Sequence, residues 1–273
     1  MDGWETRRRR GLGHDWCLVR LGVAGVLAVI EIDTRHFTGN YPPAALVEGC
    51  ADETPNATTS WRVLVPTSAL GPNKRHLFTV SDHRPVKWLR LSIVPDGGVA
   101  RLRAHGAAFF DPTGLPADGE IEISAVKYGG RILGFSDAHY GDPWVILTDG
   151  RGRDMGDGWE TRRRREPGHD WMVIALGLPG TITRLEIDTA HFKGNFPDKV
   201  SLQACRMEDR TDESIICQSM FWPDLMVPQV VQADSVHIFR SDQLAALGPV
   251  THVRLNIHPD GGISRFRAFG HRA

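Results

Sequence analysis

The sequence contains few cysteines, and they form no recognisable framework. Its 273 residues include Cys17, Cys50, Cys205 and Cys217. None of the four belongs to a Cys-x-x-Cys pair or to a cysteine–histidine pair at the spacing of a structural zinc site. The chain opens on a polar segment without a secretory pattern, so a disulfide framework is not expected. These absences predict a protein without metal or cofactor that works in a reducing, cytoplasmic setting.

Long apolar runs and an excess of one charge are missing as well. No segment approaches the ~18 consecutive apolar residues of a membrane helix. The chain carries 32 lysines and arginines against 33 acidic residues, and this balance argues against a nucleic-acid or anionic-membrane partner. Its 29 glycines and 17 prolines are scattered at turn-like positions, which is typical of many short strands.

What the sequence does contain is one long internal repeat. Residues 2–10 return unchanged as residues 157–165, at an offset of 155 positions, and residues 31–34 return at the same offset. The offset grows to 164 at the phrase Pro-Asp-Gly-Gly, as small loop insertions in the second copy would produce. A period this long far exceeds the roughly 20–50 residues of a solenoid unit, so it indicates a duplicated domain.

The two copies are unequal in length. Residues 122–156, which include a Gly-Gly-Arg and a Ser-Asp phrase, precede the second copy, and nothing like them precedes the first. We therefore expect the first repeat to lack its N-terminal segment, either because the chain is a fragment or because the gene model begins late. The predicted organisation is an incomplete first repeat at residues 1–106, a linker at 107–121 and a second repeat at 122–272.

Apolar and polar residues alternate with a period of two in several stretches, which is the pattern of half-buried strands. The predicted inward-facing residues are Met172, Ile174, Leu176, Leu185, Ile187, Val253, Leu255 and Ile257. The phrase Pro-Asp-Gly-Gly at 259–262 is expected to be the tight turn of a hairpin, whose return strand carries Arg265 and Arg267. No helix-length amphipathic pattern stands out, apart from a possible turn at 241–248.

Many short antiparallel strands with one wet face favour a sandwich of two sheets. The phrase Trp-x-x-x-x-Leu-Gly-x-x-Gly-x-Ile, which begins at Trp171, also resembles that of galactose-binding-like jelly rolls. The predicted fold class is all-β, with two tandem jelly-roll (galactose-binding-like) β-sandwich repeats.

Four adjacent arginines at 162–165 lie inside the repeated phrase, close to Asp157 and Glu160. Such a run often forms a solvated face or an ion-pair network, and here a network could join the repeats or the subunits. The alternative is that Arg162 or Arg163 clamps a substrate carboxylate through two parallel hydrogen bonds. Both interpretations remain open.

Two further phrases place polar residues beside predicted strands. His169 precedes Asp170 and could act as a general acid, but neighbours on a strand point to opposite faces, so a neutral histidine bonded to a loop is the plainer interpretation. Asp188, His191 and Asn195 follow one strand closely, as a small polar site would require. The same residues could instead cap the loop, or form a loose metal pair without a third ligand.

The predicted hairpin face is rich in positive charge and hydrogen-bonding groups. It carries Arg254, Asn256, His258, Arg265 and Arg267. Cross-strand arginines repel each other unless carboxylates or an anionic ligand lie between them. Glu186 and Asp188 are possible internal partners, and a bound anion is the alternative.

Taken together, the repeated phrases resemble those of the allantoicase family. They are Met-Gly-Asp-Gly-Trp-Glu-Thr-Arg-Arg at 155–163, Pro-Gly-His-Asp-Trp at 167–171, Glu-x-Asp-Thr-x-His-Phe-x-Gly-Asn at 186–195, Pro-Asp-Gly-Gly-x-x-Arg at 259–265, and Gly-Gly-Arg followed by Ser-Asp at 129–137. The resemblance covers essentially the whole chain. It implies a tandem jelly-roll hydrolase of purine breakdown that converts allantoate and water to ureidoglycolate and urea, often as a homo-oligomer.

Allantoate is a small monoanion with two ureido groups, so its site needs a cation for the carboxylate and acceptors for the ureido N–H groups. We expect Arg162 or Arg265 to clamp the carboxylate, and Asp188 or Glu160 to accept ureido hydrogen bonds. A histidine would protonate the departing urea nitrogen and activate water. The catalytic candidates are His191, His169, Asp188 and Glu160. The substrate-binding candidates are Arg162, Arg163, Asp157, Asn195, Arg254, Asn256, His258, Arg265 and Arg267.

Two rival hypotheses remain, a non-catalytic jelly-roll protein that binds ligands or acts as a scaffold, and an inactive homologue. The recurrence of the polar phrases in both copies argues against the first, as do the many arginines and the presence of only three tyrosines. Because the first copy is shorter, we expect the site in the second repeat.

Overall fold

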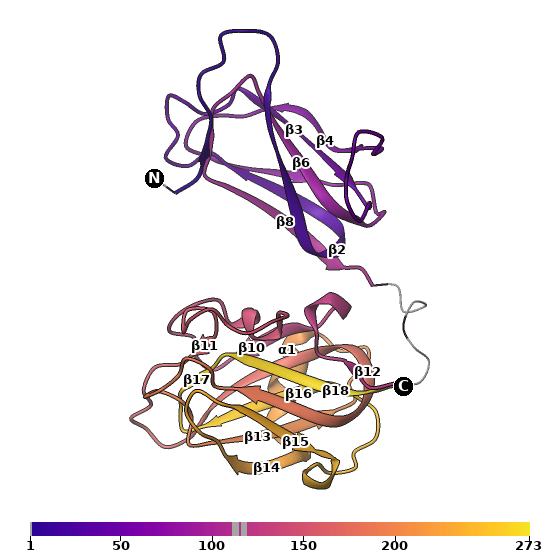
Figure 1. The fold of residues 1–273 in the computed structure, drawn as a ribbon, viewed down its shortest axis with the longest axis vertical. Coiled ribbons are helices and arrows are strands. Elements are labelled where there is room, and N and C mark those ends of the chain that lie inside the picture. Colours follow the sequence, from indigo (N-terminus) through magenta and orange to yellow (C-terminus); the bar gives the residue numbers. More distant parts are fainter. Residues whose placement is uncertain (1, 111–114, 116–118) are drawn as a thin grey trace. The chain divides into compact units, whose positions relative to one another are not determined.

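The computed structural model describes residues 2–110, 115 and 119–273, and the chain divides into two compact units (Figure 1). These units are residues 1–111 and 112–273, each built on one copy of the repeat. Parts of the predicted linker, residues 111–114 and 116–118, lie outside the described residues. No helix among the residues described is long and apolar enough to cross a membrane.

The first unit consists of strands alone in its described part. They are β1 (Trp4–Glu5), β2 (Asp15–Asp33), β3 (Ala44–Cys50), β4 (Arg62–Ala69), β5 (Arg75–Thr79), β6 (Val86–Val94), β7 (Gly98–Val99) and β8 (Arg101–Ala108). The long strand β2 changes partners along its length: residues 15–20 pair with β6, whereas residues 25–33 pair with β8 and residues 29–33 also with β5. Because its two halves have different neighbours, β2 contributes to both layers of a sandwich.

The second unit repeats this plan and adds elements to it. Its strands are β9 (Ile121–Glu122), β10 (Arg131–Phe135), β11 (Trp159–Glu160), β12 (Asp170–Asp188), β13 (Lys199–Cys205), β14 (Asp224–Val230), β15 (Val236–Arg240), β16 (Val250–His258), β17 (Gly262–Ile263) and β18 (Arg265–Arg272). Its helices are α1 (Asp212–Gln218) and the 3₁₀ turns η2 (Val126–Tyr128), η3 (Pro143–Leu147), η4 (Ser219–Phe221) and η5 (Ser241–Gln243). As in the first unit, the long strand β12 has different partners in its two halves.

Each unit has its own core, and the alternation read from the sequence is confirmed there. The predicted inward-facing residues of β12 and β16 all belong to the buried core of the second unit. A matching cluster from β2, β3 and β6 forms the core of the first unit. The period of two therefore identified the inner face of these strands correctly.

The predicted hairpin around residues 259–262 is wrong. Strand β16 pairs with β13 and with the first half of β12, whereas β18 pairs with the second half of β12. Because a single 19-residue strand serves both layers, the chain passes from one layer to the other at Pro259, through the short strand β17. Arg254, Asn256 and His258 consequently do not share a face with Arg265 and Arg267, and the predicted cross-strand repulsion does not arise.

The prediction of one wet face is also wrong for part of the second unit. Helix α1 begins after Thr211, whose hydroxyl accepts the Ser214 N–H at 3.3 Å, and it buries Ile215. Together with Trp222 it forms a small apolar cluster on Val173, which lies on the outer face of β12. No helical pattern stands out in the sequence here because α1 is only seven residues long, about two turns.

Candidate active site

A pocket of about 340 Å³ lies at the C-terminal end of β12; we call it the second-repeat pocket. Its lining residues are Gly150, Arg151, Glu186, Asp188, Ala190, Asp234, Ser235, Val236, Arg265 and Arg267. Strands β12, β15 and β18 meet here, since Asp188 lies opposite both Val236 and Arg265 in the sheet. Three of the predicted site residues, Asp188, Arg265 and Arg267, are brought together in it.

Asp188 is a buried carboxylate without a cationic partner. Its side chain is 8% exposed, and its Oδ1 accepts the Ala190 N–H at 2.7 Å. Among the described residues Asp188 makes no ion pair. A buried carboxylate without a countercharge costs stability, and groups of this kind are characteristic of functional sites.

The positive side of the pocket is held in place by the segment that precedes β11. Arg265 is buried and donates to the Gly150 carbonyl (3.2 Å) and to the carbonyl and Oδ2 of Asp157 (2.7 and 3.1 Å). Arg267 donates to the carbonyls of Gly150 (2.6 Å) and Thr148 (3.3 Å). Arg267 also pairs with Glu122 at 3.3 Å, so backbone oxygens and carboxylates together pre-orient both guanidinium groups, which lowers the cost of ordering them around an anion.

Asp157 supports Arg265 and does not line the pocket. Burial on its own would raise the pKa of Asp157, but hydrogen bonds from the Arg153 N–H and from Arg265 outweigh it and lower the pKa. The carboxylate is thus held in its charged form beside the arginine. Asp157 thus bonds to Arg265 from outside the pocket lining, and its predicted contact with substrate stays a prediction.

Glu186 is a second carboxylate at the pocket, two residues before Asp188 on the same face of β12. It is bonded to Arg184, and its Oε2 lies 4.0 Å from Arg267 Nε. The pocket is thus lined by three carboxylates and three arginines, which include Asp234 and Arg151 as an ion pair at 3.8 Å.

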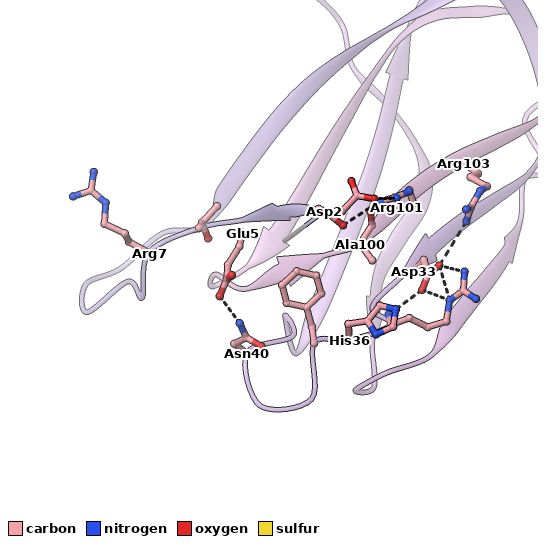
Figure 2. Close-up of a pocket in the computed structure, with 13 residues that line it drawn as sticks. Asp2, Glu5, Arg7, Asp33, His36, Asn40, Ala100, Arg101 and Arg103 are labelled. Atoms are coloured by element: carbon pink, nitrogen blue, oxygen red, sulfur yellow. Dashed lines mark hydrogen bonds and ion pairs between the residues drawn. The ribbon is translucent and has the colours of Figure 1, made fainter. Parts of the chain in front are cut away.

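The first repeat has a pocket at the corresponding position, the first-repeat pocket, of about 1030 Å³ (Figure 2). It is lined by Asp2, Gly3, Glu5, Thr6, Arg7, Asp33, Arg35, His36, Phe37, Asn40, Ala100, Arg101 and Arg103. Asp33, the counterpart of Asp188, is 1% exposed and accepts from Arg35 Nε (2.9 Å) and Nη2 (2.7 Å). Burial opposes ionisation, but Arg35 and Arg103 lower the pKa of Asp33 below its usual value.

At two positions an arginine at the first-repeat carboxylates is replaced in the second repeat by an uncharged residue. Arg35 and Arg75 bind the carboxylates of Asp33 and Glu31 in the first repeat. Their counterparts in the second repeat are Ala190 and Val236, which have no charge. The second repeat has therefore kept both carboxylates and lost these two arginines, although Glu186 bonds to Arg184 instead.

His191, Asn195 and Glu160 lie beside the second-repeat pocket without lining it. The His191 Nε2 is 2.8 Å from the Gly152 carbonyl, which can only accept, so this nitrogen carries the proton. The backbone N–H of His191 donates to Asp234 Oδ1 at 2.7 Å. Asn195 donates its side-chain amide to Glu160, as Asn40 does to Glu5 in the first repeat.

The arginine run lies in a separate groove. Arg162 pairs with Asp137, with Nη2 2.8 Å from Oδ1 and the backbone N–H 2.7 Å from Oδ2. Arg163 is exposed in this groove and has no ion pair within the described part of the chain. Asp170 accepts hydrogen bonds from Arg164 and Ser136, whereas the side chain of His169 lies against His258. The two neighbouring residues therefore have separate partners.

The remaining predicted residues form a polar cluster at the other end of β12, which we call the outer-face cluster. Its members are His169, Ser201, Gln203, Arg254, Asn256 and His258. Buried Arg254 donates to Asn256 Oδ1 (3.0 Å) and Ser219 Oγ (2.8 Å) and stacks over Trp171 at 4.4 Å. In the first repeat the matching Arg90 pairs with Glu48 at 2.7 Å, where the second repeat has Gln203.

The two histidines of the outer-face cluster are held neutral. Their rings lie 4.6 Å apart, and His258 Nε2 is 3.0 Å from Ser201 Oγ. Burial, assisted by the positive charge of Arg254, lowers the pKa of His169. Burial, assisted by His169, lowers the pKa of His258. The side chain of His169 thus packs against His258 and does not line the second-repeat pocket, and its predicted role stays a prediction.

Sequence reasoning missed several residues of the second-repeat pocket. Arg151, Asp234 and Ser235 lie in loops, which carry no periodic pattern. The pairing of Asp188 with Val236 could have pointed to Asp234 and Ser235, because these two residues directly precede Val236. It does not point to Arg151. No group of three or more His, Cys, Asp or Glu side chains within the described residues could hold a metal ion.

The model of the allantoicase repeat matches residues 1–109 and 121–273. The chain belongs to the allantoicase family. It is 51% identical to probable allantoicase 2 of Burkholderia pseudomallei over 275 residues, covering 100% of this chain and 82% of the relative. It is 50% identical to the probable allantoicase of Acinetobacter baylyi, covering 99% of this chain and 80% of the relative.

A solved allantoicase supports the same assignment. The structure of allantoicase from Saccharomyces cerevisiae superposes with a TM-score of 0.81 at 34% identity, covering 98% of this chain and 81% of the yeast chain. The predicted resemblance is thereby confirmed. So is the predicted fold class of two tandem jelly-roll β-sandwiches in the allantoicase family.

Proposed function

We propose that this allantoicase-family chain hydrolyses allantoate to ureidoglycolate and urea in the second-repeat pocket. It would thus be a hydrolase acting on carbon–nitrogen bonds other than peptide bonds. The observation that carries the proposal is Asp188, a buried carboxylate that makes no ion pair with any described residue, in a pocket that Arg265 and Arg267 also line. Family membership supplies the substrate, and the pocket supplies groups of the required types.

The chemistry of allantoate fits the distribution of charge in this pocket. Its carboxylate would lie against Arg267 and Arg265, and its ureido N–H groups would donate to Glu186 and Ser235. A cavity of about 340 Å³ is within the usual range of roughly 300–1,000 Å³ for small-molecule sites. Water would have access because the pocket is open to solvent on one side.

Asp188 would act as the general base of the reaction. It would take a proton from water, whose oxygen forms a bond to the central carbon as the carbon–nitrogen bond to one ureido group breaks. The same proton then passes to the nitrogen of the departing urea, so that atoms and charge balance. Asp157 and His191 would position Arg265 and the loop at Gly152, and they would not touch the substrate.

The other residues selected from the sequence would have supporting roles. Glu160 and Asn195 would fix the loop after β12, while Arg162 would pair with Asp137 in the groove that Arg163 also lines. The outer-face cluster, with His169, Arg254, Asn256 and His258, would hold α1 and η4 on the sheet. None of these residues lines the second-repeat pocket.

The chain is further proposed to act as a homo-oligomer in the cytoplasm. Exposed apolar side chains on β15, Val236 and Ile238, support a subunit contact, and four unpaired cysteines are compatible with a reducing compartment. Sedimentation velocity on the purified chain tests the first point, and a monomer at micromolar concentration would contradict it.

Release of urea from allantoate tests the proposed activity. Purified chain is incubated with allantoate and, as a control, with allantoin, and free urea is measured over time. Urea is expected from allantoate only. A folded chain that binds allantoate but releases no urea would support the rival hypothesis of a non-catalytic binding protein or an inactive homologue.

A further inference from the structure

The outer-face cluster of the second repeat contains a buried cation without a countercharge. Arg254 is 6% exposed and makes no ion pair within the part of the chain that the structure describes. Its guanidinium donates to two neutral groups, Asn256 Oδ1 at 3.0 Å and Ser219 Oγ at 2.8 Å. Burial lowers the pKa of Arg254, and no carboxylate offsets the effect. A buried charge without compensation destabilises a fold, and a bound anion would remove that cost.

The first repeat neutralises the corresponding arginine internally. There Arg90 pairs with Glu48 at 2.7 Å, and the two residues lie directly opposite each other in β6 and β3. In the second repeat Gln203 lies opposite Arg254 in the same register. Glutamine has nearly the shape of glutamate but carries no charge. The second repeat therefore has the cation without the carboxylate that neutralises it in the first.

The side chains around the two arginines differ as well. Leu46 and Val94 lie on the same face as the ion pair of the first repeat, and their counterparts in register are Ser201 and His258. His258 Nε2 is 3.0 Å from Ser201 Oγ, and the ring of His169 lies 4.6 Å from that of His258. Hydroxyl and imidazole groups can donate hydrogen bonds to an oxyanion, which leucine and valine cannot. The second repeat thus surrounds its unneutralised arginine with neutral polar groups.

The carboxylates that act on the histidines of the cluster are already paired. Asp170 bonds to Arg164 at 2.5 Å, and Asp198 lies 3.8 Å from Lys199. The terminal nitrogen Nη2 of Arg254 donates to no described residue and is not sealed from solvent. The free N–H groups of this arginine are therefore open to an anion from solution.

We propose that the outer-face cluster is a second binding site of this chain, which takes a small monocarboxylate. The free N–H groups of Arg254 hold the carboxylate through two parallel hydrogen bonds, and Ser201, His169 and His258 surround it. One negative charge balances one guanidinium, whereas a phosphate dianion would leave an excess of charge in a partly buried site. The cluster shares no residue with the second-repeat pocket, so the proposal stands or falls independently of allantoate hydrolysis.

Proton NMR of the full chain tests the proposal through the Cε1–H signal of His258, which is identified by its absence from His258→Gln. The chain is titrated with sodium acetate near pH 7.5, at an ionic strength held constant with sodium chloride. We expect the His258 signal to shift and to reach saturation, because the carboxylate binds beside this ring. Sodium phosphate in the same titration should bind more weakly than acetate.

Gln203→Glu restores the ion pair of the first repeat inside the second. Its carboxylate neutralises Arg254, so the affinity for acetate is expected to fall about tenfold or more, and the melting temperature without acetate should rise. Gln243→Glu is the matched control, since it adds the same charge in η5 and can still accept the Arg240 N–H. This control should bind acetate as the wild type does, and so should Arg267→Lys, which alters the second-repeat pocket.

Four results would overturn the proposal. They are a wild-type His258 signal that does not shift saturably, an unchanged acetate affinity in Gln203→Glu, a lower melting temperature of that variant, and tighter binding of phosphate than of acetate. Loss of the shift in Arg267→Lys would assign the acetate to the second-repeat pocket, and loss in Gln243→Glu would show a general effect of charge. Both outcomes also contradict a carboxylate site at Arg254.

Discussion

Asp33 and Asp188 occupy the same position at the end of the long strand of each repeat, yet their surroundings differ. Both carboxylate oxygens of Asp33 accept hydrogen bonds from Arg35, and the neighbouring Glu31 forms an ion pair with Arg75. Asp188 accepts one backbone N–H and has no cation as a partner within the described residues. A carboxylate that is already bonded on both oxygens is a poor base, so we expect Asp188, and not Asp33, to activate water.

Arg267→Lys is predicted to weaken substrate binding more than it slows the chemical step. A lysine cannot form two parallel hydrogen bonds to a carboxylate, and it loses the contacts of Arg267 with Gly150 and Thr148. Loss of one charge-assisted hydrogen bond corresponds to a rise in KM of about tenfold, with kcat changed far less. Steady-state kinetics of urea release measure both constants.

Arg103→Lys in the first repeat is the control for that substitution. Arg103 is the counterpart of Arg267, and it pairs with Glu31 in the first-repeat pocket. We expect KM to stay at the wild-type value. An equal rise of KM in the two variants, or none in Arg267→Lys, would show that the substrate carboxylate does not lie against Arg267.

At the scale of elements, the outer face of β16 makes the second repeat sensitive to acid. The pKa values of His169 and His258 are lowered mainly by burial. The unfolded chain, with histidine pKa values near 6.5, binds protons that the folded chain does not. The contribution of these two neutral histidines to the free energy of unfolding is therefore predicted to be complete above about pH 6.5. It should decrease as the pH falls from about 6.5 toward the lowered pKa values of the folded chain.

Denaturant titrations between pH 7.5 and pH 5 check this prediction. His258→Gln keeps a hydrogen-bonding group near Ser201 and removes the proton uptake, so its stability should depend less steeply on pH. His14→Gln alters the exposed counterpart of His169 and should leave the slope of the wild type. A slope that is unchanged in His258→Gln would contradict the role given to this cluster.

Elements were predicted well where the pattern is local and poorly where it is not. Alternation along β12 identified Met172 and Ile174 as core residues, because a period of two depends only on the strand itself. The hairpin prediction failed because the partner of β18 is the second half of β12, and pairing between distant segments leaves no local mark. Helix α1 was missed because two turns are too short to show a period.

At the scale of the whole molecule, the duplication and the family were readable from the sequence, but the difference between the two sites was not. Arg35, which binds Asp33, is replaced by Ala190 within the repeated phrase, but only the structure shows that this arginine contacts the carboxylate. The second change, from Arg75 to Val236, lies 48 positions beyond Asp188, and only the pairing of β12 with β15 brings it to the pocket. Physical proximity of this kind requires the fold.

The contrast between the repeats also defines the most direct test of the account, which is the rate of urea release by two matched variants. Asp188→Asn preserves the shape of the side chain and removes its basicity, so turnover of allantoate is predicted to fall by about 10²- to 10⁴-fold. Asp33→Asn should lower the melting temperature, because it weakens the contact with Arg35, while turnover stays close to that of the wild type. Full activity in Asp188→Asn, or an equal loss in both variants, would contradict a single active site in the second repeat.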